Sequence, residues 1–235
     1  MLFTGYVFLH NERPKPKFEL NFSLDNAIYI SQNWGRIQFF QNIQVTNIGN
    51  AFGTIDSLNI NIESLDKNDK FKLSATAVQR VDAGHYYRFF PINLRPTGWE
   101  GAMYAFYEEF SDTTYDHISQ LLDTIDSEKK STQTNYQISR KTHDYIANYI
   151  NAQINNFKKG RYIYLVSETS NDEYTMYSCS TFVLSETNVL QLHNLTKTIT
   201  DPFSSNKNNS IYIHLQPASI KATSYMVKKY LNLRP

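Results

Sequence analysis

Paired carboxylates are the first residues of this chain that could carry out acid–base chemistry. Glu108 and Glu109 stand side by side, and glycoside hydrolysis needs two carboxyl groups that flank one bond. We expect both to lie near the end of a strand, where successive side chains point to opposite faces. They would then not line one site, and we interpret them as a solvated strand end.

The histidines offer no pattern typical of a metal site. No two of them have the short spacing of ligands on one helix face or one hairpin. Asp116 precedes His117 and His143 precedes Asp144, and the side chains of direct neighbours diverge. The six are His10, His85, His117, His143, His193 and His214. We therefore predict neither a metal nor another cofactor.

Nucleophile and phosphate-binding motifs give no stronger signal. Cys179 is the single cysteine, and its place in an expected strand favours a small core residue over an activated thiol. The sequence has no Gly-x-Ser-x-Gly elbow for a serine nucleophile. Residues 47–53 contain two glycines, but they join two expected strands and are interpreted as a β turn. We predict no catalytic residue.

Aromatic side chains are the better candidates for binding. Trp34 and Trp99 each stand beside a glycine in a turn-like context, where an indole can present its face to a partner. The alternative is that both fill the ends of the core. Tyr86 and Tyr87 open a further aromatic segment. We predict Trp34, Trp99, Tyr86 and Tyr87 as the binding residues.

Hydrophobic periodicity indicates the strands that would position these residues. Residues 37–46 and 55–63 alternate apolar and polar side chains, which is typical of antiparallel strands with one buried and one wet face. We interpret the two runs as a hairpin joined by a turn at residues 47–50. Further strands are expected at residues 18–24, 71–77, 86–94, 101–110, 162–167, 174–184 and 211–215.

Two segments between these groups of strands show the spacing of apolar residues that is typical of helices. Residues 113–126 and 135–159 each place apolar side chains on one face, with Thr113 or Thr114 capping the first helix and Gly160 the second. A short helix at residues 185–193 and a terminal helix after Pro217 follow. The pattern predicts an α+β, mainly β fold: an antiparallel β-sandwich with an inserted helical pair and a C-terminal helix.

Chain length and net charge limit the domain organisation and the classes of partner. Residues 17–235 are expected to form a single domain, with a division near residue 112 as the alternative, and residues 1–16 an N-terminal edge strand or linker. The apolar run at residues 1–9 is too short to span a membrane, so a membrane would be reached only through an anchor upstream. The 23 basic residues are balanced by 22 acidic ones, which argues against nucleic-acid binding because phosphate neutralisation supplies most of that affinity.

The first half of the chain resembles bacterial immunoglobulin-like domains of the cell-adhesion-related type. In residues 42–51, NIQVTNIGNA, an Asn-x-Gly turn follows a strand and a small residue begins the next segment. Residues 90–98, FPINLRPTG, are similar to the strand-ending Leu-x-Pro-Gly step of those domains, with Thr97 inserted. The resemblance covers residues 17–111, and it implies an Ig-like sandwich used for adhesion, scaffolding or presentation at the cell surface.

Three functions remain as expectations. The first is a non-enzymatic binding or structural module that engages a protein partner or a second copy of itself, with the bacterial envelope or another extracytoplasmic setting preferred to the cytoplasm. The second is a virus or phage structural protein that self-assembles. The third is an enzyme whose site is formed by sequence-distant His, Asp and Glu residues.

Overall fold

Strands dominate the structure, a computed structural model that describes residues 14–22, 27–66, 70–80, 85–131, 138–154, 157–170, 173–194 and 210–219. The helices are α1 (Asp112–Ser131), α2 (Arg140–Ile154) and α3 (Glu186–Asn194). The α+β, mainly β class is confirmed. The strands are β1 (Phe18–Phe22), β2 (Ala27–Asn33), β3 (Arg36–Asn47), β4 (Gly53–Ile55), β5 (Ser57–Ser64), β6 (Lys70–Arg80), β7 (Tyr87–Arg88), β8 (Ile92–Leu94), β9 (Trp99–Phe106), β10 (Gly160–Ser170), β11 (Glu173–Leu184), β12 (Ile211–His214) and β13 (Gln216–Pro217).

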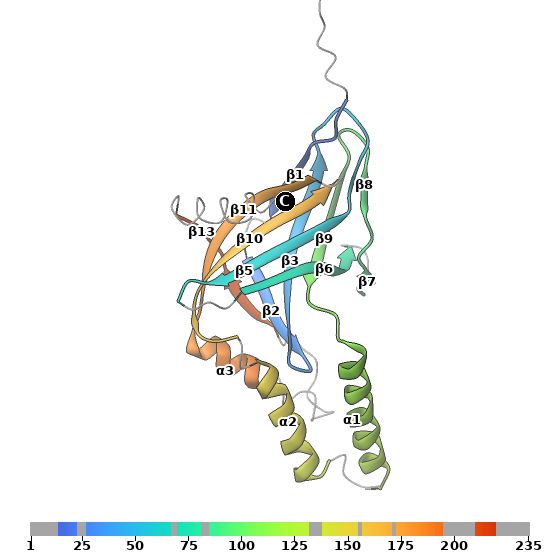
Figure 1. Ribbon diagram of the computed structural model, residues 1–235, viewed down its shortest axis with the longest axis vertical. Helices are drawn as coiled ribbons and strands as arrows, with labels where there is room; N and C mark the ends of the chain where they lie inside the picture. Colours follow the sequence, from blue (N-terminus) through green and yellow to red (C-terminus); the bar gives the residue numbers. More distant parts are fainter. Residues whose placement is uncertain are drawn as a thin grey trace, which may run out of the picture.

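Eleven of the described strands form one sheet, in the order β12-β2-β3-β9-β6-β5-β10-β11-β13, with β1 added to β3 and β7 to β6. β12 pairs with β2 at one end of this order, and β13 pairs with β11 at the other. Because only Leu215 separates β12 from β13, one stretch of chain joins both ends, and the sheet is nearly barrel-shaped (Figure 1). The expected Ig-like sandwich of two packed sheets is not confirmed.

The interior of the curled sheet holds the core. Tyr164 on β10 is fully buried and donates its hydroxyl to Oε1 of Gln41 on β3, at 2.7 Å. Three strands separate β3 from β10 in the sheet order, so this hydrogen bond crosses the interior. Burial raises the pKa of the Tyr164 hydroxyl, which stays a neutral donor.

The expected hairpin between residues 37–46 and 55–63 is wrong. The first run is β3 and the second is β5, but β9 and β6 lie between them in the sheet. After β3 the chain forms the short β4, which pairs with β8 in a separate two-stranded sheet before β5 begins. The alternating pattern therefore found both strands but not their partners.

Asn47, at the end of β3, stabilises the start of the connection from β3 to β4. Its side-chain Nδ2 donates to the carbonyls of Ala51 and Leu94, at 2.8 and 3.1 Å. Its Oδ1 accepts from the backbone N–H groups of Gly49 and Lys17, at 3.0 and 3.3 Å. The buried amide thus uses both donors and both acceptor positions. The predicted Asn-x-Gly turn is a junction of three chain segments.

The expectation of one wet face holds for β3 but not for β5. Phe39, Ile43 and Val45 of β3 are buried, as expected, while the intervening Asn42 and Gln44 are exposed. β5 has β6 on one edge and β10 on the other, and its polar positions are enclosed along with its apolar ones. The buried polar residues of β5 are Asn59, Asn61 and Glu63.

The helical pair leaves the sheet after β9 and extends from one end of it (Figure 1). α1 and α2 confirm two of the predicted helices, each with a buried stripe of three isoleucine or leucine side chains: Ile118, Leu121, Ile125 and Ile146, Ile150, Ile154. Within the described residues no helix is long and apolar enough to cross a membrane.

The helix ends differ from the predicted ones. Ser111, rather than Thr113 or Thr114, caps α1, because its Oγ accepts from the backbone N–H of Thr114 at 3.3 Å. α2 ends at Ile154, so Gly160 opens β10 and does not cap the helix. The predicted helix at residues 185–193 is confirmed as α3. The N-terminal segment up to residue 13 and the predicted terminal helix at residues 220–235 lie outside the described residues.

Candidate functional site

The four predicted binding residues fall into two separate regions. Trp99 is 66% exposed, and Tyr86 and Tyr87 are each 43% exposed. Trp34 is only 9% exposed and lies in the turn between β2 and β3. The structure therefore presents an outer surface around Trp99 and a pocket beside Trp34.

The first region, the outer aromatic surface, consists of Trp99, Gly101 and Met103 of β9 with Phe40 of β3 and Tyr86. The alternate residues of β9 point into the core, which turns these three outward. A Cβ placed on Gly101 would lie 3.5 Å from the Trp99 ring, so the indole lies along the strand over this glycine. The Tyr86 hydroxyl lies 3.2 Å from the Met103 sulfur, and its ring centroid is 5.8 Å from that of Phe40.

Polar but mostly uncharged side chains frame this surface. Cross-strand register places Asn42 opposite Met103, Gln44 opposite Gly101 and Thr46 opposite Trp99. Glu19 of β1, which pairs with Thr46, brings the negative charge of this frame. Partial burial raises the pKa of Tyr86, so its hydroxyl is neutral at physiological pH. The surface can bury apolar area and exchange hydrogen bonds.

Tyr87 lies beside this surface, not within it. It pairs with Val78 through β7 and β6. Its ring centroid is 4.4 Å from that of His85. Tyr87 is therefore a flanking residue, while Tyr86 and Trp99 are brought to the same face of β9.

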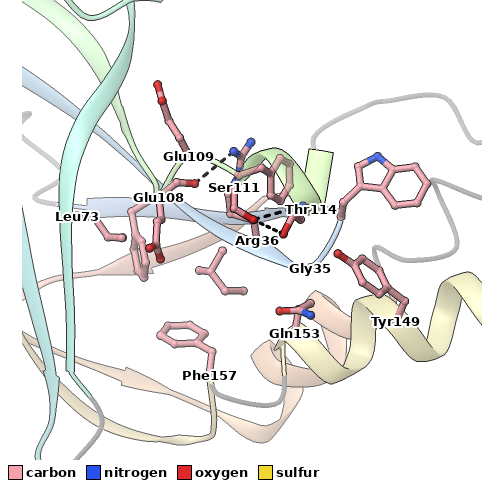
Figure 2. A pocket seen from close by; sticks show the side chains of 14 residues that line it. Gly35, Arg36, Leu73, Glu108, Glu109, Ser111, Thr114, Tyr149, Gln153 and Phe157 are labelled. Atoms are coloured by element: carbon pink, nitrogen blue, oxygen red, sulfur yellow. Dashed lines mark hydrogen bonds between the residues drawn. The ribbon is translucent and has the colours of Figure 1, made fainter. Parts of the chain in front are cut away.

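The second region is a pocket of about 440 Å³ between the β2–β3 turn, the segment after β9 and the helical pair (Figure 2). Its walls are largely aromatic, and polar groups come from both the linker and the helices. The lining residues are Trp34, Gly35, Arg36, Ile37, Phe39, Leu73, Glu108, Glu109, Phe110, Ser111, Thr114, Tyr149, Gln153 and Phe157.

The β2–β3 turn carries backbone strain at the edge of this pocket. Asn33 pairs with Arg36, which leaves a two-residue turn with φ of +52° at Trp34 and +84° at Gly35. Both signs are those of a type I′ turn, whose first position usually holds Asn, Asp or Gly. A left-handed conformation costs an ordinary residue about 1–2 kcal/mol. The fold therefore holds Trp34 in place against an intrinsic preference.

Arg36 contacts the segment after β9 and holds it in place. The sequence analysis did not identify this residue. Its guanidinium carbon lies 4.3 Å from the ring centroid of Tyr107 and 3.9 Å from that of Phe110. Its Nη1 donates to the carbonyl of Glu108 at 3.3 Å. Burial lowers the pKa of Arg36, while Tyr107 and Glu109 raise it, and a guanidinium stays charged under such shifts.

The expectation that Glu108 and Glu109 end a strand is wrong. β9 ends at Phe106, so both residues lie in an irregular linker and both line the pocket. They also line a neighbouring hollow of about 480 Å³ together with Lys72 and Arg88. Figure 2 shows the two carboxylates pointing in different directions, which is unsuited to flanking one glycosidic bond.

The described histidines are not gathered into a group of metal ligands. Each has a neighbour of another kind: Tyr87 for His85, Tyr149 for His117, Asp144 for His143, Asn151 for His193 and Tyr212 for His214. His10 lies outside the described part of the chain. Across the described ranges, no group of three or more His, Cys, Asp or Glu side chains could hold a metal ion.

Comparisons with known proteins add no chemistry to this picture. No protein-family model matches the chain, and no curated protein matches it. Among solved structures, the chain is similar to the crystal structure of a protein from Archaeoglobus fulgidus, with a TM-score of 0.32 and 8% sequence identity over 73% of this chain and 98% of the other. A similarity of that size carries no functional argument, so function has to be argued from this chain's own residues.

Proposed function

We propose that the protein is a non-enzymatic binding module that engages a protein partner through the outer aromatic surface. The observation that carries this proposal is the 66% exposure of Trp99 on a strand face framed mainly by uncharged side chains. The centres of protein interfaces are enriched in Trp, Tyr, Phe and Met and depleted in charge. Trp and Tyr also dominate the energetic hot spots of such interfaces.

The position of this surface supports the proposal. β9 pairs with β3 along its whole length and with β6 along residues 102–106, so its backbone is held in place before a partner arrives. The Trp99 ring is supported by the backbone at Gly101, and the Tyr86 ring by Phe40 and Met103. Side chains that are already ordered lose less conformational entropy on binding. A small surface of this kind can therefore give useful affinity.

The remaining expectations are compatible with this role and stay predictions. An extracytoplasmic setting, at the bacterial envelope, and a kinship with bacterial Ig-like domains both agree with adhesion or presentation. The partner we propose is another protein. A second copy of this chain, which a self-assembling particle protein would use, is the alternative occupant of the same surface.

Photo-crosslinking in the native cells tests the proposal. A photoreactive amino acid replaces Trp99 in one variant and Tyr145, an exposed aromatic on α2, in the control variant. We expect a discrete adduct with one other protein from position 99 and none from position 145. An adduct between two copies of this chain would favour self-assembly. No adduct at position 99, or the same adducts from both positions, would contradict the proposal.

A further inference from the structure

The walls of the pocket favour a ligand with an apolar, flat body. Five aromatic rings line it: Trp34, Phe39, Phe110, Tyr149 and Phe157. Phe157 packs edge-to-face on Phe39 at a centroid distance of 5.7 Å, which fixes the deep part of this wall. The volume of about 440 Å³ lies in the range of small-molecule sites.

The charges of the lining residues favour a ligand of one sign of charge. Glu108 and Glu109 bring two negative charges and Arg36 brings one positive charge, so the lining carries a net charge of −1. Both carboxylates belong to exposed residues, Glu108 and Glu109, where a ligand can reach them. Aromatic ring faces attract cations as well, because of their quadrupole.

Arg36 is largely engaged by contacts within the protein, although its buried Nε has no hydrogen-bond partner in the described residues. Aromatic rings lie within 4.3 Å of its guanidinium carbon, and one of its N–H groups already donates to the carbonyl of Glu108. A negatively charged ligand would in addition meet the two carboxylates. The remaining polar groups, from Ser111, Thr114, Tyr149 and Gln153, are neutral and can accept a hydrogen bond from a cation.

We infer that this pocket is a binding site for a small organic cation, a primary ammonium group carried on an aromatic body. The body lies among the ring faces, and the ammonium lies at the mouth, where Glu108 and Glu109 line the pocket with carboxylates that point in different directions. The left-handed backbone of Trp34 fits this role, because strained residues concentrate where a fold holds a side chain against a ligand. The site is separate from the outer aromatic surface and does not depend on the partner proposed for it.

Three probes of similar size and different charge test this inference. They are 2-phenylethylammonium, the neutral 2-phenylethanol and the anionic 3-phenylpropanoate, titrated into the full chain by calorimetry. Trp34 fluorescence in a Trp99→Phe chain reports locally on the pocket. We expect saturable binding of the ammonium that is about tenfold tighter than that of the alcohol and weaker still for the carboxylate, and that falls as salt rises.

Variants separate the charge of the site from its shape. The double variant Glu108→Gln, Glu109→Gln should lower the affinity for the ammonium about tenfold and leave that for the alcohol unchanged. Tyr149→Ala should weaken both. The matched control is Asp123→Asn, an exposed carboxylate on α1, which should change neither. The inference is overturned if no probe saturates, if the carboxylate binds as tightly as the ammonium, or if the double variant keeps the ammonium preference.

Discussion

Asn47 is the residue whose side chain ties together the most distant parts of the chain. Asn47→Ala removes four hydrogen bonds and leaves the carbonyls of Ala51 and Leu94 without this donor. We expect the free energy of unfolding to fall by about 2–4 kcal/mol, as for other buried hydrogen-bond networks. Urea denaturation measures it. Asn42→Ala, at an exposed position of the same strand, should stay within about 0.5 kcal/mol of the parent; equal losses in the two variants would contradict the role of Asn47.

Thr97 is strained in the turn before β9. Gly98 donates its N–H to the carbonyl of Arg95 at 2.9 Å, and Thr97 has a φ of +62°. Together with Pro96 this matches a type II turn, whose third position favours Gly or Asn. Thr97→Asn should therefore raise the free energy of unfolding by about 0.5–1 kcal/mol, since Asn tolerates this conformation better. A lower thermal midpoint for Thr97→Asn would show that the strain is not relieved.

At the residue scale, the sequence predicted burial correctly where it depends on the pattern of neighbouring residues in the same strand. The alternation in β3 correctly indicated Phe39, Ile43 and Val45 as buried. It could not indicate Arg36, because the rings that enclose its guanidinium belong to Tyr107 and Phe110, far along the chain. Nor could it separate Trp34 from Trp99, since both stand beside glycines and only the fold decides which is buried.

At the scale of the elements, the β2–β3 turn packs closely against α2. A Cβ on Gly35 would lie 2.5 Å from Cβ of Gln153 and 3.0 Å from the carbonyl of Ile150. Gly35→Ala should therefore push α2 from the turn and cost about 2–3 kcal/mol of stability, with the unfavourable left-handed backbone included. Gly101→Ala is the matched control, because its new Cβ meets its nearest neighbour at an ordinary 3.5 Å. Chemical denaturation of both variants checks this; equal stability would refute the close contact.

Glu128 of α1 stabilises the start of α2. Its carboxylate accepts from the Thr142 hydroxyl at 2.5 Å and from the backbone N–H of Ser139 at 2.6 Å. These hydrogen bonds, with that from Thr142 the largest cause, lower the pKa of Glu128. A lowered folded-state pKa adds stability above the unfolded value of about 4.3. That stability is lost as the pH falls through the folded pKa.

This linkage gives a pH test with a defined sign. Glu128→Gln should be less stable than the parent at pH 6, and the difference should be smaller at pH 3, below the unfolded pKa of about 4.3. Because the carboxylate is exposed, we expect the difference at pH 6 to be under about 1 kcal/mol. Urea denaturation at the two pH values measures it, with Asp123→Asn on the same helix as control. A difference that is undiminished at pH 3 would assign the effect to something other than the charge.

For the elements, their existence was easier to predict than their pairing. Period-two alternation indicates a strand from its own residues, and β3, β5 and β12 were found in this way. Pairing depends on contacts that are distant in sequence, so the expected hairpin of β3 with β5 failed when β9 and β6 inserted between them. The helix after residue 135 was predicted too long, because Lys158 and Gly160 resemble a helix end but belong to the approach to β10.

For the whole molecule, closure of the sheet is the feature that no local pattern carries. It depends on one stretch, residues 211–217, that changes partner from β2 to β11 at Leu215. The sequence indicates a late strand there but not that it pairs at both ends of the sheet. Closure also separates the two regions: the outer aromatic surface lies on the outer face of the sheet, and the pocket lies where the helical pair meets the sheet.

The central claim, that the outer aromatic surface binds a protein, is tested most directly by affinity for the purified partner identified through crosslinking. The double variant Trp99→Ala, Tyr86→Ala should weaken binding by at least about 30-fold, since truncation of central aromatic side chains costs 2 kcal/mol or more. Tyr145→Ala, an aromatic of similar exposure on α2, should leave the affinity unchanged. An unchanged affinity in the double variant, with both proteins folded, would contradict the account.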